Sequence, residues 1–169
     1  MSLYVQWMNL IKERATVAWL TESQRVIYDQ IVNQWGAARF VNLVGPVGSG
    51  KTFLAWILVK EQAYVYEHDL RAAPPNTQQV IVDDAEYTRL MRSTAQALSL
   101  GRVILITETP VKDPMPRAEL RLTEHDVHQA LHNLYANCSI QFTASDPKGT
   151  DLARIIRTEV IARGGLYVG

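Results

Sequence analysis

Residues 40–60 have the sequence FVNLV GPVGSGKT FLAWILVK, in which a glycine-rich loop lies between two apolar runs. The run at 40–44 predicts a buried strand, and residues 51–61 predict a helix. The loop at 45–52 matches the pattern G-x-x-x-x-G-K followed by Ser or Thr at every position. A strand, this loop and a helix in direct succession indicate an α/β fold with a phosphate-binding loop.

The loop has the chemistry to bind a triphosphate. Its glycines permit turns that a side chain would obstruct, so its amides can point inward and form an anion site, to which the following helix adds its positive N-terminal end. We expect Lys51 to reach the β and γ phosphates and the Thr52 hydroxyl to bind magnesium. The predicted ligand is a purine nucleoside triphosphate, ATP with Mg²⁺. The residues expected to contact it are Gly45, Pro46, Val47, Gly48, Ser49, Gly50, Lys51, Thr52 and Phe53.

A second apolar run, VIVDDAE at residues 80–86, ends in two carboxylates. A magnesium ion that bridges two phosphates needs an acidic partner from a strand near the loop, and Asp83 is predicted to be that partner. Asp84 is predicted to polarise the attacking water, with Glu86 as a competitor for this role. The alternative is that the acidic residues only cap the helix that follows.

A third run, RVILITETP at residues 102–110, is a predicted buried strand that ends in polar residues. The hydroxyl of Thr107 is the candidate to hold the attacking water or to sense the γ-phosphate, which makes it a predicted catalytic residue with Lys51 and Asp84. The alternative is a strand-end threonine without a catalytic role.

The remaining sequence alternates helices and strands after an N-terminal helical segment. Helices are predicted at residues 3–14, 21–36, 51–61, 86–98, 123–135 and 151–163, and strands at 40–44, 63–66, 80–83, 103–107 and 119–122. Thr21 and Thr123 are expected to cap their helices, and Thr150 or Asp151 the last one. This alternation predicts a mostly parallel sheet covered on both faces. We divide the chain into a helical segment at 1–36, packed on the core, and an α/β domain at 37–169.

Composition narrows the class of protein. With 17 basic and 17 acidic residues the formal net charge is zero, so no global field attracts nucleic acid or a membrane. The N-terminus lacks a signal-peptide pattern, and no stretch approaches a membrane span in length, so we expect a cytoplasmic protein. Cys138 is expected to be buried and inert. His125, His128 and His132 share one side of a predicted helix, and we interpret them as a solvent or interface face rather than a metal site.

The segments GPVGSGKT, VIVDDAE and VILITETP, in this order and spacing, resemble the AAA+ ATPases, and most closely the bacterial replication-initiator and helicase-loader clade. The segment AELRLTEHDVHQAL at 118–131 is similar to the last core strand and first lid helix of that clade. The resemblance implies a P-loop NTPase three-layer sandwich with a small C-terminal lid of helices. It also implies ATP hydrolysis, an arginine finger, for which Arg117 is a candidate, and a lid arginine, for which Arg154 and Arg157 are candidates. Either of these lid arginines alone is expected to be solvated.

Two features depart from the pattern of that clade. The connection between residues 66 and 80 is short and contains prolines, so either its crossover helix is lost or the adjacent strand is an irregular edge. Little sequence remains after residue 131 for a full lid. A further motif, LTESQ, is similar to the beginning of helicases in which a glutamine reads adenine, and this makes Gln24 a candidate adenine contact.

Three functions remain open at this point. The first is an AAA+-like ATPase that couples its nucleotide state to a protein partner or to further copies of itself, with nucleic acid reached only indirectly and no membrane. The second is a small-molecule kinase, for which KDPMPR at 112–117 is the candidate lid. The third is a regulatory subunit that binds ATP without hydrolysing it.

Overall fold

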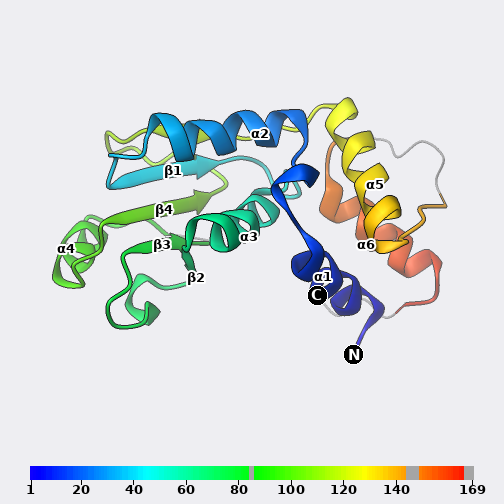
Figure 1. The fold of residues 1–169 in the computed structure, drawn as a ribbon, viewed down its shortest axis with the longest axis horizontal. Helices are drawn as coiled ribbons and strands as arrows, with labels where there is room; N and C mark the ends of the chain where they lie inside the picture. The colour runs from blue at the N-terminus through cyan, green and yellow to red at the C-terminus, as the bar shows by residue number, and fades with distance from the viewer. Residues whose placement is uncertain (84–85, 144–148, 166–169) are drawn as a thin grey trace.

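The computed structural model describes residues 1–83, 86–143 and 149–165. These residues form an α/β fold built on a five-stranded sheet with the order β2-β3-β4-β1-β5 (Figure 1). Every pair of neighbouring strands is parallel, which confirms the predicted parallel sheet. The strands are β1 (Phe40–Val44), β2 (Val65–Glu67), β3 (Gln79–Val82), β4 (Arg102–Thr107) and β5 (Arg117–Glu119).

The helices begin where the sequence provides side-chain caps. Thr21 and Gln24 form a reciprocal capping box at the start of α2, and Thr123 and Asp126 form another at the start of α5, as the spacing of these residues predicts. Asp151 caps α6. The α-helices are α1 (Leu3–Arg14), α2 (Glu22–Asp29), α3 (Lys51–Gln62), α4 (Leu90–Ala97), α5 (Glu124–Cys138) and α6 (Leu152–Ala162), with 3-10 turns η1 (Val17–Trp19) and η3 (Leu70–Ala72) and a π-helical turn η2 (Gln30–Gln34).

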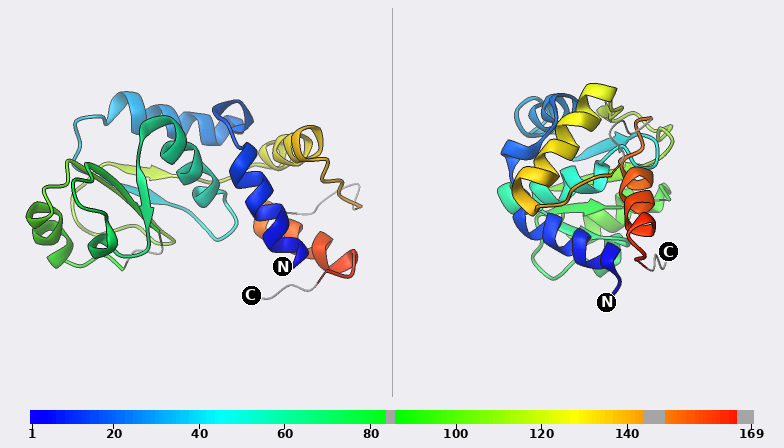
Figure 2. Two further views of the ribbon diagram at one scale, coloured as in Figure 1. Left: turned by 60° about the horizontal axis from the view of Figure 1, so that its bottom comes forward. Right: turned by 90° about the vertical axis from the view of Figure 1, so that its right-hand side faces the viewer.

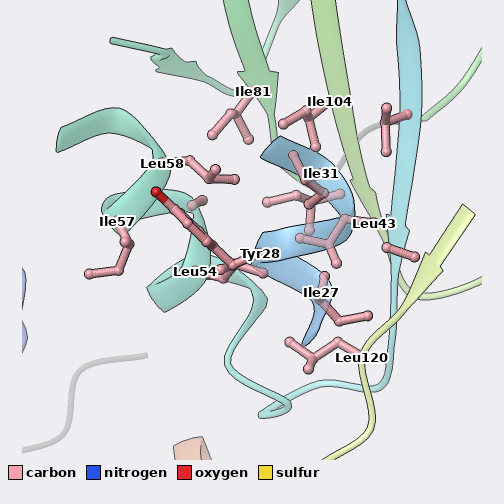
Figure 3. Packing of buried hydrophobic residues seen from close by; sticks show 14 of the residues in the cluster. Ile27, Tyr28, Ile31, Leu43, Leu54, Ile57, Leu58, Ile81, Ile104 and Leu120 are labelled. Atoms are coloured by element: carbon pink, nitrogen blue, oxygen red, sulfur yellow. The ribbon is translucent and has the colours of Figure 1, made fainter. Parts of the chain in front are cut away.

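Alternating residues of the strands supply two separate cores. Val41, Leu43, Ile104 and Ile106 pack against α2, η2 and α3 on one face (Figure 3). Residues of opposite parity, such as Val103 and Leu105, pack on the other face with residues of α4 and η3. The sheet is therefore covered on both faces, and its strands are apolar on both sides as a buried parallel sheet requires.

A separate helical part lies beyond the carboxyl ends of the strands. Helix α1 contacts both α5 and α6, and the arrowheads of β1 and β4 point toward this group (Figures 1 and 2). Its core contains Trp7, Ile11, Leu134, Ile156 and Val160. The segment at 1–36 is thus divided, because α1 packs in this helical part whereas α2 packs on the sheet. Within the described ranges, none of the helices combines the length and apolar character needed to cross a membrane.

Three elements begin two residues or more from their predicted starts. Strand β5 begins at Arg117 rather than residue 119, because Arg117–Glu119 pairs in register with residues 42–44 of β1. Strand β2 begins at Val65 rather than residue 63, because Ala63 adopts a left-handed conformation (φ 55°) at the end of α3. Helix α4 begins at Leu90 rather than residue 86, because residues 86–88 have no regular secondary structure and the Tyr87 side chain bonds to Asp113.

The short connection between β2 and β3 retains a parallel crossover. It contains η3 in place of a full helix, and the buried Leu70 of that turn packs in the same core as Val103 and Leu105. Strand β2 is an edge strand of three residues. The crossover helix is thus reduced to a single turn, and the adjacent strand is a short edge strand, so both predicted explanations of the short connection hold in part.

Candidate nucleotide-binding site

The glycine-rich loop connects β1 to α3 at the carboxyl edge of the sheet. Gly48 and Gly50 have φ angles of +77° and +83°, which side-chain-bearing residues rarely adopt. A Cβ atom on Gly45 would lie 2.3 Å from the carbonyl oxygen of Leu120, so this position has no space for a side chain. The Lys51 Nζ atom donates hydrogen bonds to the carbonyl oxygens of Gly45 (2.7 Å) and Pro46 (2.8 Å). The lysine therefore returns over the loop that precedes it, as a phosphate-binding role requires.

The predicted metal-binding residues lie together. Asp83 follows β3 and is 6 % exposed, and its Oδ2 atom accepts a hydrogen bond of 3.1 Å from the Thr52 hydroxyl at the start of α3. The same carboxylate oxygen accepts a short hydrogen bond from the Tyr66 hydroxyl on β2. The structure thus brings Lys51, Thr52 and Asp83 to one edge of the sheet. Asp84, the predicted base, lies outside the described residues.

The donors at this point fit magnesium. Hydroxyl and carboxylate oxygens are the ligands that this hard cation prefers, and it is commonly held by one or two carboxylates together with substrate phosphates. Among the residues that the structure describes, no group of three or more His, Cys, Asp or Glu side chains could hold a metal ion. Thr52 and Asp83 are the two side chains here whose oxygens could contact a magnesium ion.

Thr107 lies beside the loop but its hydroxyl is engaged. The residue pairs with Val44, and its carbonyl oxygen accepts a hydrogen bond of 3.2 Å from the amide of Gly45. Its hydroxyl donates to the carbonyl oxygen of Thr109 (2.8 Å) and accepts from the side-chain amide of Asn42 (2.9 Å). Because β4 lies between β1 and β3, Thr107 is placed between the loop and the acidic strand. Its catalytic role stays a prediction.

Asn42 is a site residue that the sequence reasoning missed. It is fully buried in β1, and its amide nitrogen donates to the carbonyl oxygen of Leu105 (3.1 Å) as well as to Thr107. Its Oδ1 atom accepts from the amide of Val111 (2.9 Å). Asn42 thereby fixes the chain beyond β4. The signal for it was present, since a polar residue interrupts an otherwise apolar strand and must find buried partners.

An apolar cavity of about 390 Å³ adjoins the loop. Its size falls within the range of small-molecule sites, and a few polar groups stand among its apolar lining residues. The cavity lies where the glycine-rich loop and α3 meet η1, α1, α5 and α6. Its lining includes Tyr4, Met8, Ile11, Trp19, Gln24, Val47, Gly48, Gly50, Lys51, Thr52, Phe53, Trp56, Leu134, Leu152, Ile156 and Arg157.

The structure separates the two predicted lid arginines. Arg157 is partly buried and lines the cavity, whereas Arg154 is exposed and is not among the lining residues. The expectation of a solvated side chain is therefore wrong for Arg157, because α6 turns it toward the loop. Gln24 also lines the cavity and is 2 % exposed, and its Nε2 atom would lie 2.4 Å from a Cβ atom on Gly50. Gln24 thus lies next to the glycine-rich loop, and its contact with adenine stays a prediction.

The helical part touches the glycine-rich loop directly. The amide of Leu152, at the start of α6, donates to the carbonyl oxygen of Gly48 (3.1 Å). A Cβ atom on Gly48 would lie 1.8 Å from the Oδ1 atom of Asp151, the residue that caps α6. The start of α6 and the loop therefore fit together only because residue 48 is a glycine.

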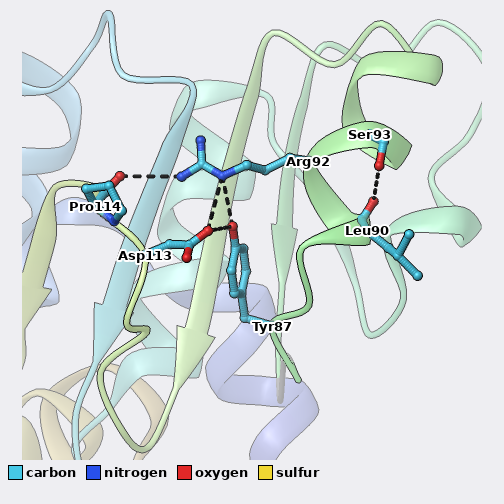
Figure 4. Close-up of polar contacts among 6 residues, drawn as sticks. All are labelled: Tyr87, Leu90, Arg92, Ser93, Asp113 and Pro114. Atoms are coloured by element: carbon cyan, nitrogen blue, oxygen red, sulfur yellow. Dashed lines mark hydrogen bonds and ion pairs between the residues drawn. The ribbon is translucent and has the colours of Figure 1, made fainter.

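A polar cluster joins the segments that follow β3 and β4 (Figure 4). The Tyr87 hydroxyl donates to Asp113 (2.6 Å) and accepts from Arg92 (2.9 Å), and Arg92 Nε lies 3.4 Å from the Asp113 carboxylate. Burial raises the pKa of Tyr87, and its hydrogen bond to Asp113 raises it further. That bond in turn lowers the pKa of Asp113 below its ordinary value. Tyr87 and Asp113 also line an open groove of about 630 Å³, together with Thr107.

The other predicted candidates lie away from the loop. Arg117 is exposed on the edge strand β5, and the three histidines of α5 are exposed along that helix. Cys138 is buried, as predicted, and burial raises the pKa of its thiol. A high thiol pKa lowers the thiolate fraction, which agrees with an inert cysteine.

The chain matches no protein-family model, and a search of curated proteins gave no match. The interpretation of the site therefore depends on its residues and their geometry.

Proposed function

We propose that this chain binds ATP with Mg²⁺ at residues 45–53 and hydrolyses it. The observation that carries the proposal is the contact between Thr52, at the end of the loop, and Asp83, at the end of β3. The sequence predicts these two residues as metal ligands from separate motifs, and an accidental glycine-rich turn gives no reason for them to meet. Magnesium, when bound, would neutralise part of the charge on the β and γ phosphates.

Each residue has a separate task in this proposal. The amides of the loop and the N-terminal end of α3 bind the phosphates, and the Lys51 ammonium moves from the carbonyl oxygens of Gly45 and Pro46 to the phosphate oxygens. Asp84, which follows Asp83 in the sequence, accepts a proton from the attacking water. Thr107, between the loop and Asp83, orients that water.

The apolar cavity is the proposed site of the purine ring. It adjoins the loop through Val47 and Phe53, and the aromatic rings of Trp19 and Trp56 among its lining residues suit a flat heterocycle. Arg157 reaches the same space from α6 and would approach the phosphates as the lid arginine. An apolar pocket beside a phosphate cradle supports a nucleotide over inorganic phosphate or polyphosphate as the ligand.

The arrangement also supports coupling to a partner of the kind that the AAA+ resemblance implies. The cavity and the loop are both bounded by the helical part, so the presence of a nucleotide would change how that part sits on the sheet domain. We propose that this change is read by a protein partner or by a second copy of the chain, and that any effect on nucleic acid is indirect.

Binding is tested by titrating ATP and magnesium into the purified protein in a calorimeter. Lys51→Ala should abolish measurable binding, while Arg71→Ala, which removes the same charge from an exposed side chain away from the cavity and the groove, should not change it. Equal affinities for wild type and Lys51→Ala would refute the proposal. Steady-state hydrolysis tests the catalytic step, and equal rates for wild type and Asp84→Asn would exclude Asp84 as the base.

A regulatory subunit that binds ATP without turnover is the second candidate function. It is favoured by the Thr107 hydroxyl, whose proton is used by the Thr109 carbonyl oxygen rather than offered to a water. Tight ATP binding with negligible hydrolysis, in the presence of added partners as well as alone, would select this function over the first.

A further inference from the structure

We propose that Tyr66 is the positioning residue of the magnesium site, and that its hydroxyl holds the Asp83 carboxylate in its metal-binding orientation. The inference rests on the proposed function and adds to it a residue from outside the three motifs. Tyr66 lies on the edge strand β2, remote in sequence from the loop and separated from Asp83 by the irregular crossover.

The position of Tyr66 follows from the register of the sheet. Tyr66 pairs with Ile81 and Glu67 with Val82, and the pairing continues when the Asp83 amide donates to the carbonyl oxygen of Glu67 (2.9 Å). The Tyr66 ring packs against the core on the α3 face, and its edge contacts His68 with ring centroids 5.6 Å apart. The ring is thus fixed between α3 and β3, where its hydroxyl meets Asp83.

Two hydroxyl groups reach the same oxygen of Asp83. Thr52 donates to Oδ2 from α3, and Tyr66 donates to it from β2. Two donors from different elements restrict rotation of the carboxylate more than one donor does. Hydrogen bonds to a charged acceptor are also stronger than those between neutral groups.

The two hydroxyls differ in what else they have to do. In the proposed function Thr52 is also a metal ligand, so its oxygen turns toward the cation when a nucleotide is bound. Tyr66 is not among the proposed metal ligands, and its hydroxyl donates to Asp83. Tyr66 therefore holds Asp83 in place while Thr52 changes partners.

The test compares nucleotide binding with and without magnesium in Tyr66→Phe. Partners that orient a metal ligand typically change metal affinity by 10–100-fold, so we expect the variant to need about tenfold more Mg²⁺ for half of the effect on ATP binding. ATP affinity in EDTA should stay within about twofold of wild type, because the phosphate cradle itself is unchanged. A merely structural role for the phenol would lower both affinities alike.

Tyr64→Phe is the matched control. Tyr64 lies two residues earlier in the chain, is 3 % exposed and packs in the same core, so the change removes the same atom from the same face without touching Asp83. It should leave the magnesium response unchanged. Tyr66→Met also removes the hydroxyl but leaves an apolar side chain of a different shape. If the hydroxyl is responsible, this variant should need the same higher Mg²⁺ concentration as Tyr66→Phe.

The outcomes separate this inference from the proposed function. If Mg²⁺ strengthens ATP binding to wild type and to Tyr66→Phe equally, at the same concentrations, the role of Tyr66 is refuted and the proposed function stands. A wild-type protein that binds no ATP overturns both. A Tyr64→Phe variant with the same magnesium defect would also refute the inference, since the effect would then come from the core.

Discussion

Replacing Asp126 by Asn should destabilise the protein far more than its single-atom change suggests. Asp126 is 1 % exposed at the start of α5, and its Oδ2 atom accepts from the Thr123 amide, the Thr123 hydroxyl and the Ser23 hydroxyl, each at 2.7 Å. Its Oδ1 atom accepts from the Ser23 amide at 3.0 Å. One carboxylate therefore caps two helices, its own α5 and the neighbouring α2.

The magnitude follows from what an amide can retain. An Asn side chain can place its oxygen at the Oδ2 position, but its NH₂ group then faces the N–H of Ser23, donor against donor. A buried donor without a partner costs about 1–3 kcal/mol. The loss of negative charge weakens the three remaining bonds, so we expect a total of about 3 kcal/mol in the free energy of unfolding. At roughly 2–4 °C per kcal/mol for a chain of this size, the melting temperature should fall by about 6–12 °C.

Urea unfolding of wild type, Asp126→Asn and Glu124→Gln measures this effect. Glu124 lies exposed in the same first turn, so its substitution removes the same charge without removing a buried acceptor, and it should cost less than about 1 kcal/mol. A Glu124→Gln variant as unstable as Asp126→Asn would refute the hydrogen-bond reasoning, because charge at the helix end would then suffice.

The same residue predicts a dependence on pH. Burial raises the pKa of Asp126, but the hydrogen bonds from Thr123 and Ser23 outweigh burial and hold the pKa well below its ordinary value. A lowered carboxyl pKa stabilises the fold above the unfolded pKa of about 4, and this contribution is lost as the pH falls toward the folded pKa. The stability difference between wild type and Asp126→Asn should therefore be constant from neutral pH to about pH 5 and shrink below about pH 4. A difference that stays constant in acid would contradict this assignment.

Two further substitutions test the loop and the polar cluster. Gly48→Ala should lower the unfolding free energy by about 1–2 kcal/mol more than Gly149→Ala, measured in urea, because both residues have positive φ but only Gly48 would clash with the cap of α6. Equal costs would mean that α6 does not press on the loop. Tyr87→Phe should cost at most about 1 kcal/mol at neutral pH, since the cluster is partly exposed. Because the pKa of Tyr87 is raised in the folded state, its contribution to the free energy of unfolding is present below about pH 10 and lost above it. The unfolding free energies of wild type and Tyr87→Phe, measured as a function of pH, should therefore converge in alkali.

The elements that could be predicted from sequence are those whose signal is local. The glycine-rich loop, its flanking strand and helix, and the caps at Thr21 and Thr123 each depend on residues within a few positions of one another. The wrong boundaries arise where a distant partner decides. Arg117 joins β5 because β1 lies beside it, and its own sequence, charged and next to a proline, gives no strand signal.

The contacts that complete the site could not be predicted for the same reason. Tyr66 reaches Asp83 only because β2 runs alongside β3 in a particular register, and nothing in its neighbours fixes that register. The contact of α6 with Gly48 depends on how a helix from the end of the chain folds back. Asn42 is the exception, because an amide side chain in an apolar strand predicts buried hydrogen-bond partners, although the sequence does not identify them.

The start of α2 is the point where the proposed nucleotide site and the helical part meet. Gln24 accepts from the Thr21 amide within the capping box, while its Nε2 atom faces Gly50 of the loop. The preceding residue, Ser23, donates to Asp126 of α5. In the proposed function, a nucleotide that shifts Gly50 would press on this buried glutamine, which caps the helix to which α5 is bonded. We therefore expect Asp126 to link the glycine-rich loop to α5 as well as to stabilise both helices. If this is correct, Asp126→Asn should weaken ATP binding at temperatures where the variant is still fully folded, whereas Glu124→Gln should not.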